Sequence, residues 1–381
     1  MEFAFTPDQE ALRARVRAFL SALPTDPEAD SEDTPNRASE RALAANGWLT
    51  MAWPKEFGGH GAAQMDQLIF KEELFEVGGG FDFLGVQLVG PTIMVHGSDD
   101  QKRAHLPAIA RADVRWCQGF SEPGAGSDLA SLQTRAVRDG DDFVINGQKI
   151  WTSNAHHADW ILLLTRTDPE APKHRGISMF VVDMKTPGIT IRPLVQLTGV
   201  HGFNEVFFED VRVPASNMVG ELNRGWYAAT TTLDFERSGI ERNLVARRDW
   251  NRIFKTVRSG ALDAVLAGRP SSWRHRLADL YIEIEAGQWM ARRVAYMQGR
   301  GLVPNYEASM SKTFNSELGQ RVADAGVNLF GLAGQLRAGE RSAAKGAIAF
   351  RYLDARRLTI GQGTSEINRN IIATRGLGLA R

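Results

Sequence analysis

The sequence has 381 residues, and its 45 Lys and Arg residues balance 45 Asp and Glu residues, so the formal net charge at pH 7 is zero. Hydrophobic residues make up 43% of the chain and aromatic residues 9%, a composition that excludes low-complexity disorder, collagen and a long coiled coil. The balanced charge argues against broad binding to nucleic acid, which requires a basic field, but it is compatible with a local basic pocket for an anionic ligand. The 37 glycines slightly exceed average usage and indicate turns and close backbone approaches.

The N-terminal segment and the single cysteine favour a soluble protein in a reducing compartment. Cys117 has no partner for an internal disulfide and no recognisable nucleophile pattern around it, so we expect it in the core. The segment Met1–Phe5 lacks the basic and apolar regions of a signal peptide, and no apolar run approaches the length of a membrane span. We therefore expect a cytoplasmic protein without membrane contact.

The N-terminal zone, residues 1–112, has the pattern of a helical domain. Thr6 is a suitable N-cap, Pro7 suits the first helical position, and Gln9 completes the spacing of a capping box. Apolar residues then follow at helical spacing as far as Leu23. Further helices are predicted over Glu40–Asn46, Met65–Val77 and Ser98–Ala112.

The middle zone, residues 113–220, has the pattern of an antiparallel β domain. Asn146-Gly147 lies between apolar runs and suits the positive φ angles of a type I′ turn, so we expect a hairpin there. No glycine fingerprint of a dinucleotide-binding unit follows a strand, which argues against a nicotinamide cofactor. Further strands are predicted over Trp160–Leu164, Ile177–Val182, Ile189–Ile191 and Val206–Phe208.

The C-terminal zone, residues 221–381, is predicted to be helical again, which makes the fold class α+β and mainly α. Alanine is frequent there and strand-like alternation is absent. The predicted helices cover Gly225–Gly260, Ser272–Gly299, Tyr306–Leu332 and Ala338–Tyr352, and a last helix begins near Ser365.

A charged pair interrupts the apolar face of the first of these helices. The stripe that runs from Trp226 to Leu244 lacks one turn, and Glu236 and Arg237 occupy that position. Charges on a buried face are costly unless they are paired or face a cavity. One interpretation is a buried ion pair or an oligomer contact, and the other is a carboxylate base beside a ligand.

Two glycine-containing loops could bring backbone N–H groups close to a ligand. Phe120–Asp128 combines two glycines, a proline and two serines after a strand, which suits a phosphate or a planar cofactor as well as a plain turn. Gly361–Glu366 precedes the last helix and could receive an anion or simply cap the helix. The pair His156-His157 has no further ligand at metal spacing, so no metal site is predicted.

These segments together resemble the acyl-CoA dehydrogenase family over essentially the whole chain. The resemblance rests on several motifs that occur in the family's order. They are Phe120-Ser-Glu-Pro-Gly-Ala-Gly-Ser-Asp128, Asn146-Gly-Gln-Lys-Ile-Trp-Thr-Ser-Asn154, Phe203-Asn-Glu-Val-Phe-Phe-Glu-Asp-Val-Arg-Val-Pro214, Leu233-Asp-Phe-Glu-Arg237, Ala308-Ser-Met-Ser-Lys312 and Gly363-Thr-Ser-Glu-Ile-Asn-Arg369.

The resemblance implies an N-terminal helical domain (1–112), a middle β domain (113–220) and a C-terminal four-helix bundle (221–381). It implies FAD as the cofactor, bound between the β domain and the bundle, and the oxidation of an acyl-CoA thioester to the trans-2-enoyl-CoA. In this family a carboxylate removes the α proton while the β hydride passes to flavin N5. An α proton beside a thioester is weakly acidic, so hydrogen bonds to the carbonyl oxygen must stabilise the developing charge.

Individual positions carry family roles by resemblance. Phe120 and Ser121 should lie along the flavin ring, and Ser127 near the cofactor pyrophosphate and the pantetheine arm of the substrate. Trp151 and Ser153 should cover the other side of the isoalloxazine. The remaining positions are Asp234 and Arg237, expected to contact CoA, and Thr364 and Glu366, expected to contact FAD at the start of the last helix.

One departure from the family concerns the catalytic base. Many members place a Glu immediately before the Gly-Thr of the last motif, where this chain has Gln362. A carboxamide has no useful basicity, so Gln362 is expected only to line the substrate pocket. Another branch, which resembles isovaleryl-CoA and long-chain enzymes, takes the base from the Leu-Asp-x-Glu-Arg helix. There this chain has Glu236, which we therefore expect to be the catalytic residue.

A second departure concerns assembly. The stretch Arg247–Arg276 lacks the Arg-x-x-Phe-Gly segment of many members, and Asn328–Gly334 alters a glycine-rich helix end. In the family both segments complete the cofactor site of a neighbouring subunit. These departures resemble bacterial subfamilies that act on bulky or dicarboxylic acyl-CoAs, some of which assemble from two different subunits.

Several alternatives follow from these departures. A homo-oligomer, either dimer or tetramer, is expected by resemblance, and a hetero-oligomer is the alternative. The chain could be a half-site or non-catalytic subunit, or a same-fold flavin oxidase or monooxygenase. For a dehydrogenase, an electron-transfer flavoprotein is the expected acceptor.

Overall fold

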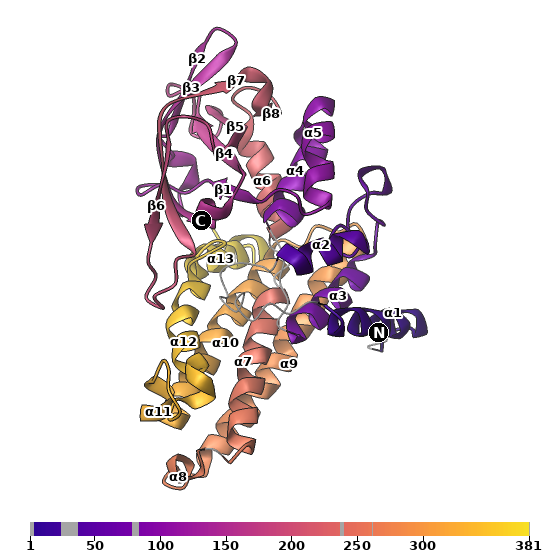
Figure 1. The fold of residues 1–381 in the computed structure, drawn as a ribbon, viewed down its shortest axis with the longest axis vertical. Coiled ribbons are helices and arrows are strands. Elements are labelled where there is room, and N and C mark those ends of the chain that lie inside the picture. The colour runs from indigo at the N-terminus through magenta and orange to yellow at the C-terminus, as the bar shows by residue number, and fades with distance from the viewer. Residues whose placement is uncertain (1–3, 24–36, 78–83, 237–239, 261, 381) are drawn as a thin grey trace. The chain divides into compact units, whose positions relative to one another are not determined.

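The computed structural model describes residues 4–23, 37–77, 84–236, 240–260 and 262–380, and the side chains of residues 231–236 lie outside the described part. The chain divides into two units (Figure 1). The sheet unit consists of Ala22–Ala62 and Gly80–Glu236, and the bundle unit consists of Met1–Ser21, Ala63–Gly79 and Arg237–Arg381.

The sheet unit contains an eight-stranded sheet in the order β6-β7-β3-β2-β4-β5-β8, with β1 paired to β4. Most neighbours are antiparallel, as predicted, whereas β4 runs parallel to β1 and to β2. Its core consists of inward-facing residues such as Ile145, Ile161 and Val206. Cys117 is fully buried in the same core, which confirms the structural role expected for it. The strands are β1 (Trp116–Gly119), β2 (Arg135–Asp139), β3 (Asp142–Ser153), β4 (Trp160–Arg166), β5 (Ile177–Asp183), β6 (Ile189–Leu194), β7 (Phe203–Pro214) and β8 (Met218–Val219).

Helices cover part of this sheet. Helix α6 packs against β5 and against α4 (Figure 1). Helix α4 is additional to the predicted helices, because Gly90 and Pro91 at its start indicate a turn as readily as a helix. A complete capping box at Ser98 and Gln101 begins α5. The helices of this unit are α2 (Arg37–Ala45), α4 (Gly90–His96), α5 (Asp99–Ala110) and α6 (Gly225–Glu236).

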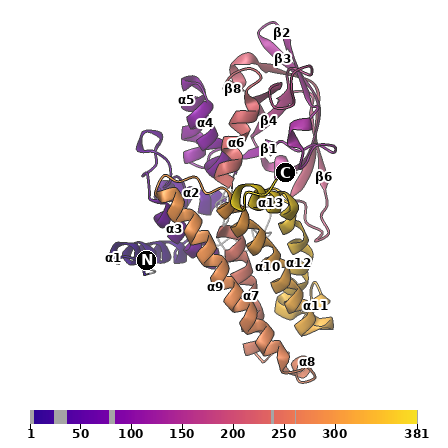
Figure 2. The ribbon, with the colours of Figure 1, turned by 180° about the vertical axis from the view of Figure 1, so that it is seen from behind.

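In the bundle unit, α7, α9 and α10 run side by side, and α12 packs against α10 (Figures 1 and 2). Their shared core includes Leu280, Ile284, Leu318 and Val322. The helices of this unit are α1 (Pro7–Ser21), α3 (Gln64–Glu76), α7 (Ile240–Arg258), α8 (Asp263–Leu266), α9 (Ser272–Gly299), α10 (Tyr306–Phe330), α11 (Leu332–Gln335), α12 (Ala347–Asp354) and α13 (Ser365–Ile371). The fold class expected from the sequence is therefore confirmed.

The capping box predicted for the first helix is present. The Thr6 hydroxyl accepts from the Gln9 backbone N–H at 3.3 Å, and the Gln9 side chain accepts from the Thr6 N–H at 3.0 Å. Leu12, Val16 and Leu20 then form the buried face of α1. This helix start could be predicted from the local sequence, because both reciprocal hydrogen bonds lie within four consecutive residues.

The hairpin predicted at Asn146-Gly147 is wrong. Strand β3 continues through both residues, and the turn lies instead at Gly140-Asp141, where Gly140 has φ 63°. Asn146 exchanges two hydrogen bonds with Asp210 across a bulge between β3 and β7. A bulge, like a turn, accepts residues with unusual backbone angles. The Asn-Gly pair alone therefore could not show which of the two forms at this place.

Two predicted helices also differ from the structure. The range Gly225–Gly260 contains two helices, α6 and α7, whose described residues end at Glu236 and resume at Ile240. The apolar stripe is thus divided between two helices. The helix predicted over Ala338–Tyr352 starts only at Ala347, because Gly339 and Gly346 have φ 95° and 91°.

Candidate active site

The loop Phe120–Asp128 is organised by one buried carboxylate. Glu122 accepts hydrogen bonds from the backbone N–H groups of Gln133 at 2.6 Å and Thr134 at 2.8 Å, and it pairs with Lys149 Nζ at 2.7 Å. Its own N–H and carbonyl each bond to Ala125 at 3.0 Å. The loop is therefore held in one conformation by the strand β3 and the segment before β2.

Lys149 is a buried residue beside this loop that the sequence analysis did not single out. Its side chain is fully buried, and its Nζ donates to the Phe120 carbonyl at 3.1 Å as well as to Glu122. Burial lowers the pKa of Lys149 to about 8, against the opposing effect of Glu122. Burial also raises the pKa of Glu122, but Lys149 and the hydrogen bonds from Thr134 and Gln133 outweigh this effect and lower it. The alternation of inward residues along β3 is the signal that could have found Lys149.

The structure brings Phe120 and Ser121 beside the end of β3, which carries Trp151 and Ser153. The Ile150 N–H donates to the Ser121 carbonyl at 2.9 Å, so the end of β3 runs beside the start of the loop. Trp151 follows with φ 59°, and its side chain is 59% exposed. Phe120 is buried, whereas Ser121 and Ser153 are half-buried and Ser127 is exposed.

Open space adjoins this loop. A Cβ atom added at Gly124 or Gly126 would meet no heavy atom within 4 Å in the described part of the chain. A hollow of about 500 Å³ lies against the loop, and it is lined by Glu122–Ala125, Ser131, Gln133, Thr134, Gly147 and Gln148. A hollow of this size is within the range of small-molecule sites.

The turn before α13 carries the predicted residues of the bundle unit. Gln362 has φ 58°, and its Oε1 is buried without a hydrogen-bond partner among the described residues. The Thr364 hydroxyl caps α13 by accepting from the Ile367 N–H at 3.2 Å. Hydrogen bonds from its own backbone and from Thr364 lower the pKa of the exposed Glu366.

Helix α10 packs against α13 and also carries buried polar atoms that have no hydrogen-bond partner among the described residues. Lys312 on α10 is 3% exposed, and its Nζ has no hydrogen-bond partner among the described residues. Burial, together with the charge of Arg242, lowers the pKa of Lys312 to about 8. Side-chain oxygens of Ser309, Thr313 and Ser365 are likewise buried without a hydrogen-bond partner within the described chain. Buried polar side-chain atoms in native proteins are usually hydrogen-bonded, so these atoms are suited to contact a polar ligand.

The remaining predicted residues are described only in part. Asp234 and Glu236 lie in the last turn of α6, but their side chains are outside the described part of the structure. Arg237 lies outside the described residues altogether.

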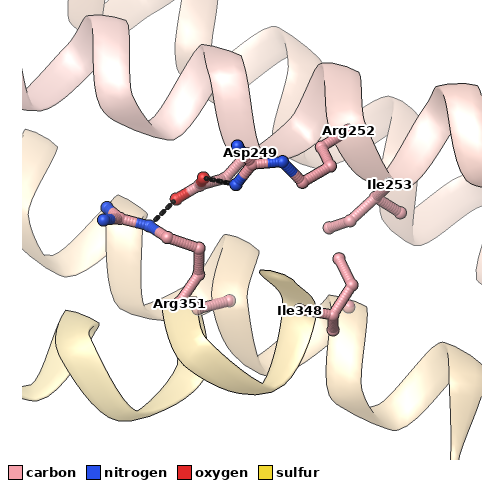
Figure 3. Close-up of a pocket in the computed structure, with 7 residues that line it drawn as sticks. Asp249, Arg252, Ile253, Ile348 and Arg351 are labelled. Carbon is pink, nitrogen blue, oxygen red and sulfur yellow. Dashed lines mark hydrogen bonds and ion pairs between the residues drawn. The ribbon is translucent and has the colours of Figure 1, made fainter. Parts of the chain in front are cut away.

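A void inside the bundle unit is too small for a cofactor or a substrate. Figure 3 shows that Asp249 and Arg351, which line it, point toward each other, and their ion pair measures 2.9 Å. Its volume is about 10 Å³, which is the space of a single water molecule.

Two negative findings apply to the described residues. No group of His, Cys, Asp or Glu side chains among them is arranged to hold a metal ion. Within the same residues, no helix combines the length and apolar character that crossing a membrane requires.

Family models match almost the entire chain. The N-terminal, middle and C-terminal domain models of acyl-CoA dehydrogenases match residues 6–113, 117–211 and 223–377, respectively. The chain belongs to the acyl-CoA dehydrogenase family. Its reaction class is therefore the FAD-dependent dehydrogenation of an acyl-CoA.

Individual relatives agree with this assignment. The chain is 37% identical to the acyl-CoA dehydrogenase FadE26 of Mycobacterium tuberculosis, and the match covers 100% of this chain and 99% of FadE26. Among solved structures it resembles the Tcur3481-Tcur3483 steroid ACAD, with a TM-score of 0.91, 35% identity and full coverage of both chains. It also resembles the ChsE4-ChsE5 complex from Mycobacterium tuberculosis, with a TM-score of 0.90, 36% identity and full coverage of both chains.

Proposed function

We propose that the chain oxidises an acyl-CoA thioester to the trans-2-enoyl-CoA, with FAD as cofactor and Glu236 as the base that removes the α proton. The observation that carries the assignment of the base is the residue before Gly363. Gln362 stands where many family members have the catalytic Glu, and its amide cannot accept a proton at useful pH. Glu236 is a carboxylate at the family's alternative position, on the last turn of α6.

The residues of the sheet unit fit a planar cofactor. Trp151 offers a large exposed ring, and the Phe120–Ser121 backbone runs beside the same strand end. Gly124 and Gly126 leave the loop open to the close approach of a phosphate group. We therefore propose Phe120, Ser121, Ser127, Trp151 and Ser153 as FAD ligands.

The residues of the bundle unit fit a polar ligand as well. The unpaired Gln362 Oε1 and Lys312 Nζ are buried polar atoms without partners among the described residues, and such atoms require a hydrogen-bonding group. We propose Thr364 and Glu366 as further FAD ligands and Gln362 as a residue of the substrate pocket. When bound, FAD supplies the acceptor for the substrate's β hydride.

The proposed substrate residues have distinct tasks. Asp234 and Arg237 bind the CoA portion, and Ser127 binds the pantetheine arm. Arg237 is a suitable anion ligand because its guanidinium stays charged and forks onto phosphate oxygens. Glu236 then holds the abstracted proton. The acyl group is proposed to be bulky, with a ring system, in view of the steroid ACAD that the chain resembles.

An absorption spectrum of the purified protein tests this function. We expect flavin absorbance in the protein as isolated or after addition of FAD, and anaerobic loss of that absorbance when an acyl-CoA is added. The panel should contain straight-chain, branched and ring-bearing acyl-CoAs, and electron transfer to an electron-transfer flavoprotein should exceed reoxidation by air. A protein that binds FAD but is reduced by none of these thioesters would contradict the proposal, and fast reoxidation by air would indicate an oxidase.

A second candidate function, as one subunit of a two-chain enzyme, is favoured by a specific contact. An added Cβ at Gly331 would lie 2.2 Å from Arg269 Nη2, so the two altered segments Arg247–Arg276 and Asn328–Gly334 meet at one place in the bundle unit. Leu332 beside them is 81% exposed. We propose this place as the contact with a second chain of the same fold, in line with the two-chain names of both solved structures. A single purified chain with a full complement of reducible FAD would contradict the need for a second chain.

A further inference from the structure

His156 and His201 form a stack beside the strand end that carries Trp151, and the ring of His157 is tilted against that of His156. The ring of His156 lies 4.1 Å from that of His201, nearly parallel at 14°, and 3.9 Å from that of His157. His156 and His157 come from the turn after β3, whereas His201 precedes β7. The stack is therefore part of the sheet unit alone.

The fully buried Asn204 connects this stack to the backbone of β3. Its Nδ2 donates to the Thr152 carbonyl at 3.1 Å and lies 3.1 Å from His156 Nδ1, and its Oδ1 lies 2.9 Å from His201 Nε2. The Thr152 carbonyl fixes the orientation of the amide, because a flipped amide would place two acceptors against each other.

This orientation fixes whether His156 Nδ1 and His201 Nε2 carry a proton. Nδ2 donates to His156 Nδ1, so that nitrogen carries no proton and His156 is neutral. Oδ1 accepts from His201 Nε2, so that nitrogen carries a proton. A proton added at His156 Nδ1 would face the Nδ2 donor and break the hydrogen bond.

The same hydrogen bonds hold a strained stretch at the end of β3 and directly after it. Trp151 and Asn154 have φ 59° and 54°, values that non-glycine residues rarely adopt. The Asn154 N–H donates to the Gly202 carbonyl at 2.8 Å, and the Trp151 ring packs edge-on against Phe203 at 6.0 Å. The segment Trp151–Asn154 is thus attached to Gly202 and to Phe203 at the start of β7, beside the Asn204 amide.

We propose that Asn204, aligned by neutral His156 and by His201, is a positioning residue that holds Trp151–Asn154 in the conformation that binds the flavin. This inference rests on the proposed function, in which Trp151 and Ser153 contact FAD. Asn204 acts through the strand and not by touching the cofactor. The two histidines hydrogen-bond to the amide in place of water, so the amide keeps one orientation.

Electrostatic surroundings favour the neutral state. Burial, together with the charges of His157 and His201, lowers the pKa of His156 to about 4. Burial and the charges of Arg115, His201 and Arg37 lower the pKa of His157. The two arginines are in turn balanced by acids, Arg115 by Glu40 at 3.3 Å and Arg37 by Asp159 at 3.7 Å.

Matched variants of the full-length protein test the proposal. Asn reproduces the position of an imidazole Nδ1 and Gln that of an Nε2, so His156→Asn and His201→Gln keep the hydrogen bonds, whereas His156→Leu and His201→Leu remove them. We expect the Leu variants to lose FAD affinity by about tenfold or more, since binding must then order the segment, and the Asn and Gln variants to stay within about threefold of wild type. The exposed His275→Gln is the control.

A second measurement is independent of the flavin. NMR of the protein labelled at the histidine rings should show His156 neutral, with its proton on Nε2, at about pH 5.5, where an ordinary histidine is mostly charged. Leu variants that fold and bind FAD as wild type does, or a His156 that titrates with an ordinary pKa, would overturn the positioning role. A wild-type protein that binds no FAD would instead contradict the proposed function, while the NMR result would still show whether the stack is neutral.

Discussion

Gly124 and Gly126 are glycines that the protein itself does not require. Neither has a positive φ, and a Cβ at either would meet no heavy atom within 4 Å in the described chain. By contrast, a Cβ at Gly225 would lie 2.5 Å from the backbone of Ser178. Both positions thus have room for the ligand that we propose to approach the backbone of this loop.

Gly126→Ala should weaken FAD binding without changing the stability of the FAD-free protein. We expect the unfolding free energy of the FAD-free protein to change by less than about 0.5 kcal/mol, and the Kd for FAD to rise by about tenfold, because the methyl group would occupy the space of the ligand. Urea unfolding and flavin titration measure the two quantities. Gly268→Ala, which also has open space around its Cβ, is the control, and an unchanged Kd for Gly126→Ala would contradict a flavin at this loop.

Lys312 is a buried cation without a hydrogen-bond partner among the described residues. We expect Lys312→Met to stabilise the FAD-free protein by about 1–3 kcal/mol, since it removes an unsatisfied polar group at similar volume. The folded pKa of about 8 lies below the ordinary 10.5, so the unfolded chain binds more protons between these values and stability should rise with pH there. Lys312→Met should reduce that rise.

Unfolding in urea at several pH values checks this expectation, with the exposed Lys255→Met on α7 as the control. A Lys312→Met protein that is less stable than wild type would show that the ammonium makes a favourable interaction in the folded state.

At the scale of elements, the signals that lie within a few residues predicted structure well. The helix predicted over Ser272–Gly299 has those bounds in the structure, and the capping pair Thr6–Gln9 is present. Asn146-Gly147 misled the prediction because its conformation is decided by Asp210 on another strand. Alternation along β3 could have marked Lys149 as inward-facing, but its pairing with Glu122 and the histidine stack were not predictable from local patterns, because each joins residues from distant parts of the chain.

The bulge itself gives a test at this scale. Gly147 has φ 149°, and an added Cβ would lie 2.7 Å from the Thr134 backbone. We expect Gly147→Ala to destabilise the protein by about 1–3 kcal/mol, whereas Gly124→Ala should change the unfolding free energy by less than about 0.5 kcal/mol. Thermal or urea unfolding compares the two, and equal stabilities would show that β3 can adjust at the bulge.

For the whole molecule, the helical–β–helical order was predictable from composition and periodicity, but the division into units was not. The bundle unit takes in α1 and α3 from the N-terminal zone. Buried ion pairs make this connection, with Glu72 bonded to Arg13 at 2.8 Å and to Arg292 at 3.0 Å. Such pairs join residues more than fifty positions apart and leave no periodic signal in the sequence.

The exposed Leu332 gives a test of assembly. If the end of the bundle unit at Gly331 contacts another chain, Leu332→Glu should weaken association while leaving the thermal midpoint nearly unchanged, because it places a charge in an apolar contact. Sedimentation at several concentrations measures the effect. The control is Leu302→Glu, at an exposed position between α9 and α10, and identical association of both variants would exclude this surface from the interface.

The most direct test concerns Glu236 as the base. Flavin reduction by a competent acyl-CoA is followed anaerobically by stopped flow in Glu236→Gln and in the exposed control Glu221→Gln. We expect Glu236→Gln to bind FAD normally and to be reduced about 10²–10⁴-fold more slowly, which is the usual contribution of a general base, and Glu221→Gln to react as wild type does. Flavin reduction in Glu236→Gln at close to the wild-type rate would contradict the assignment.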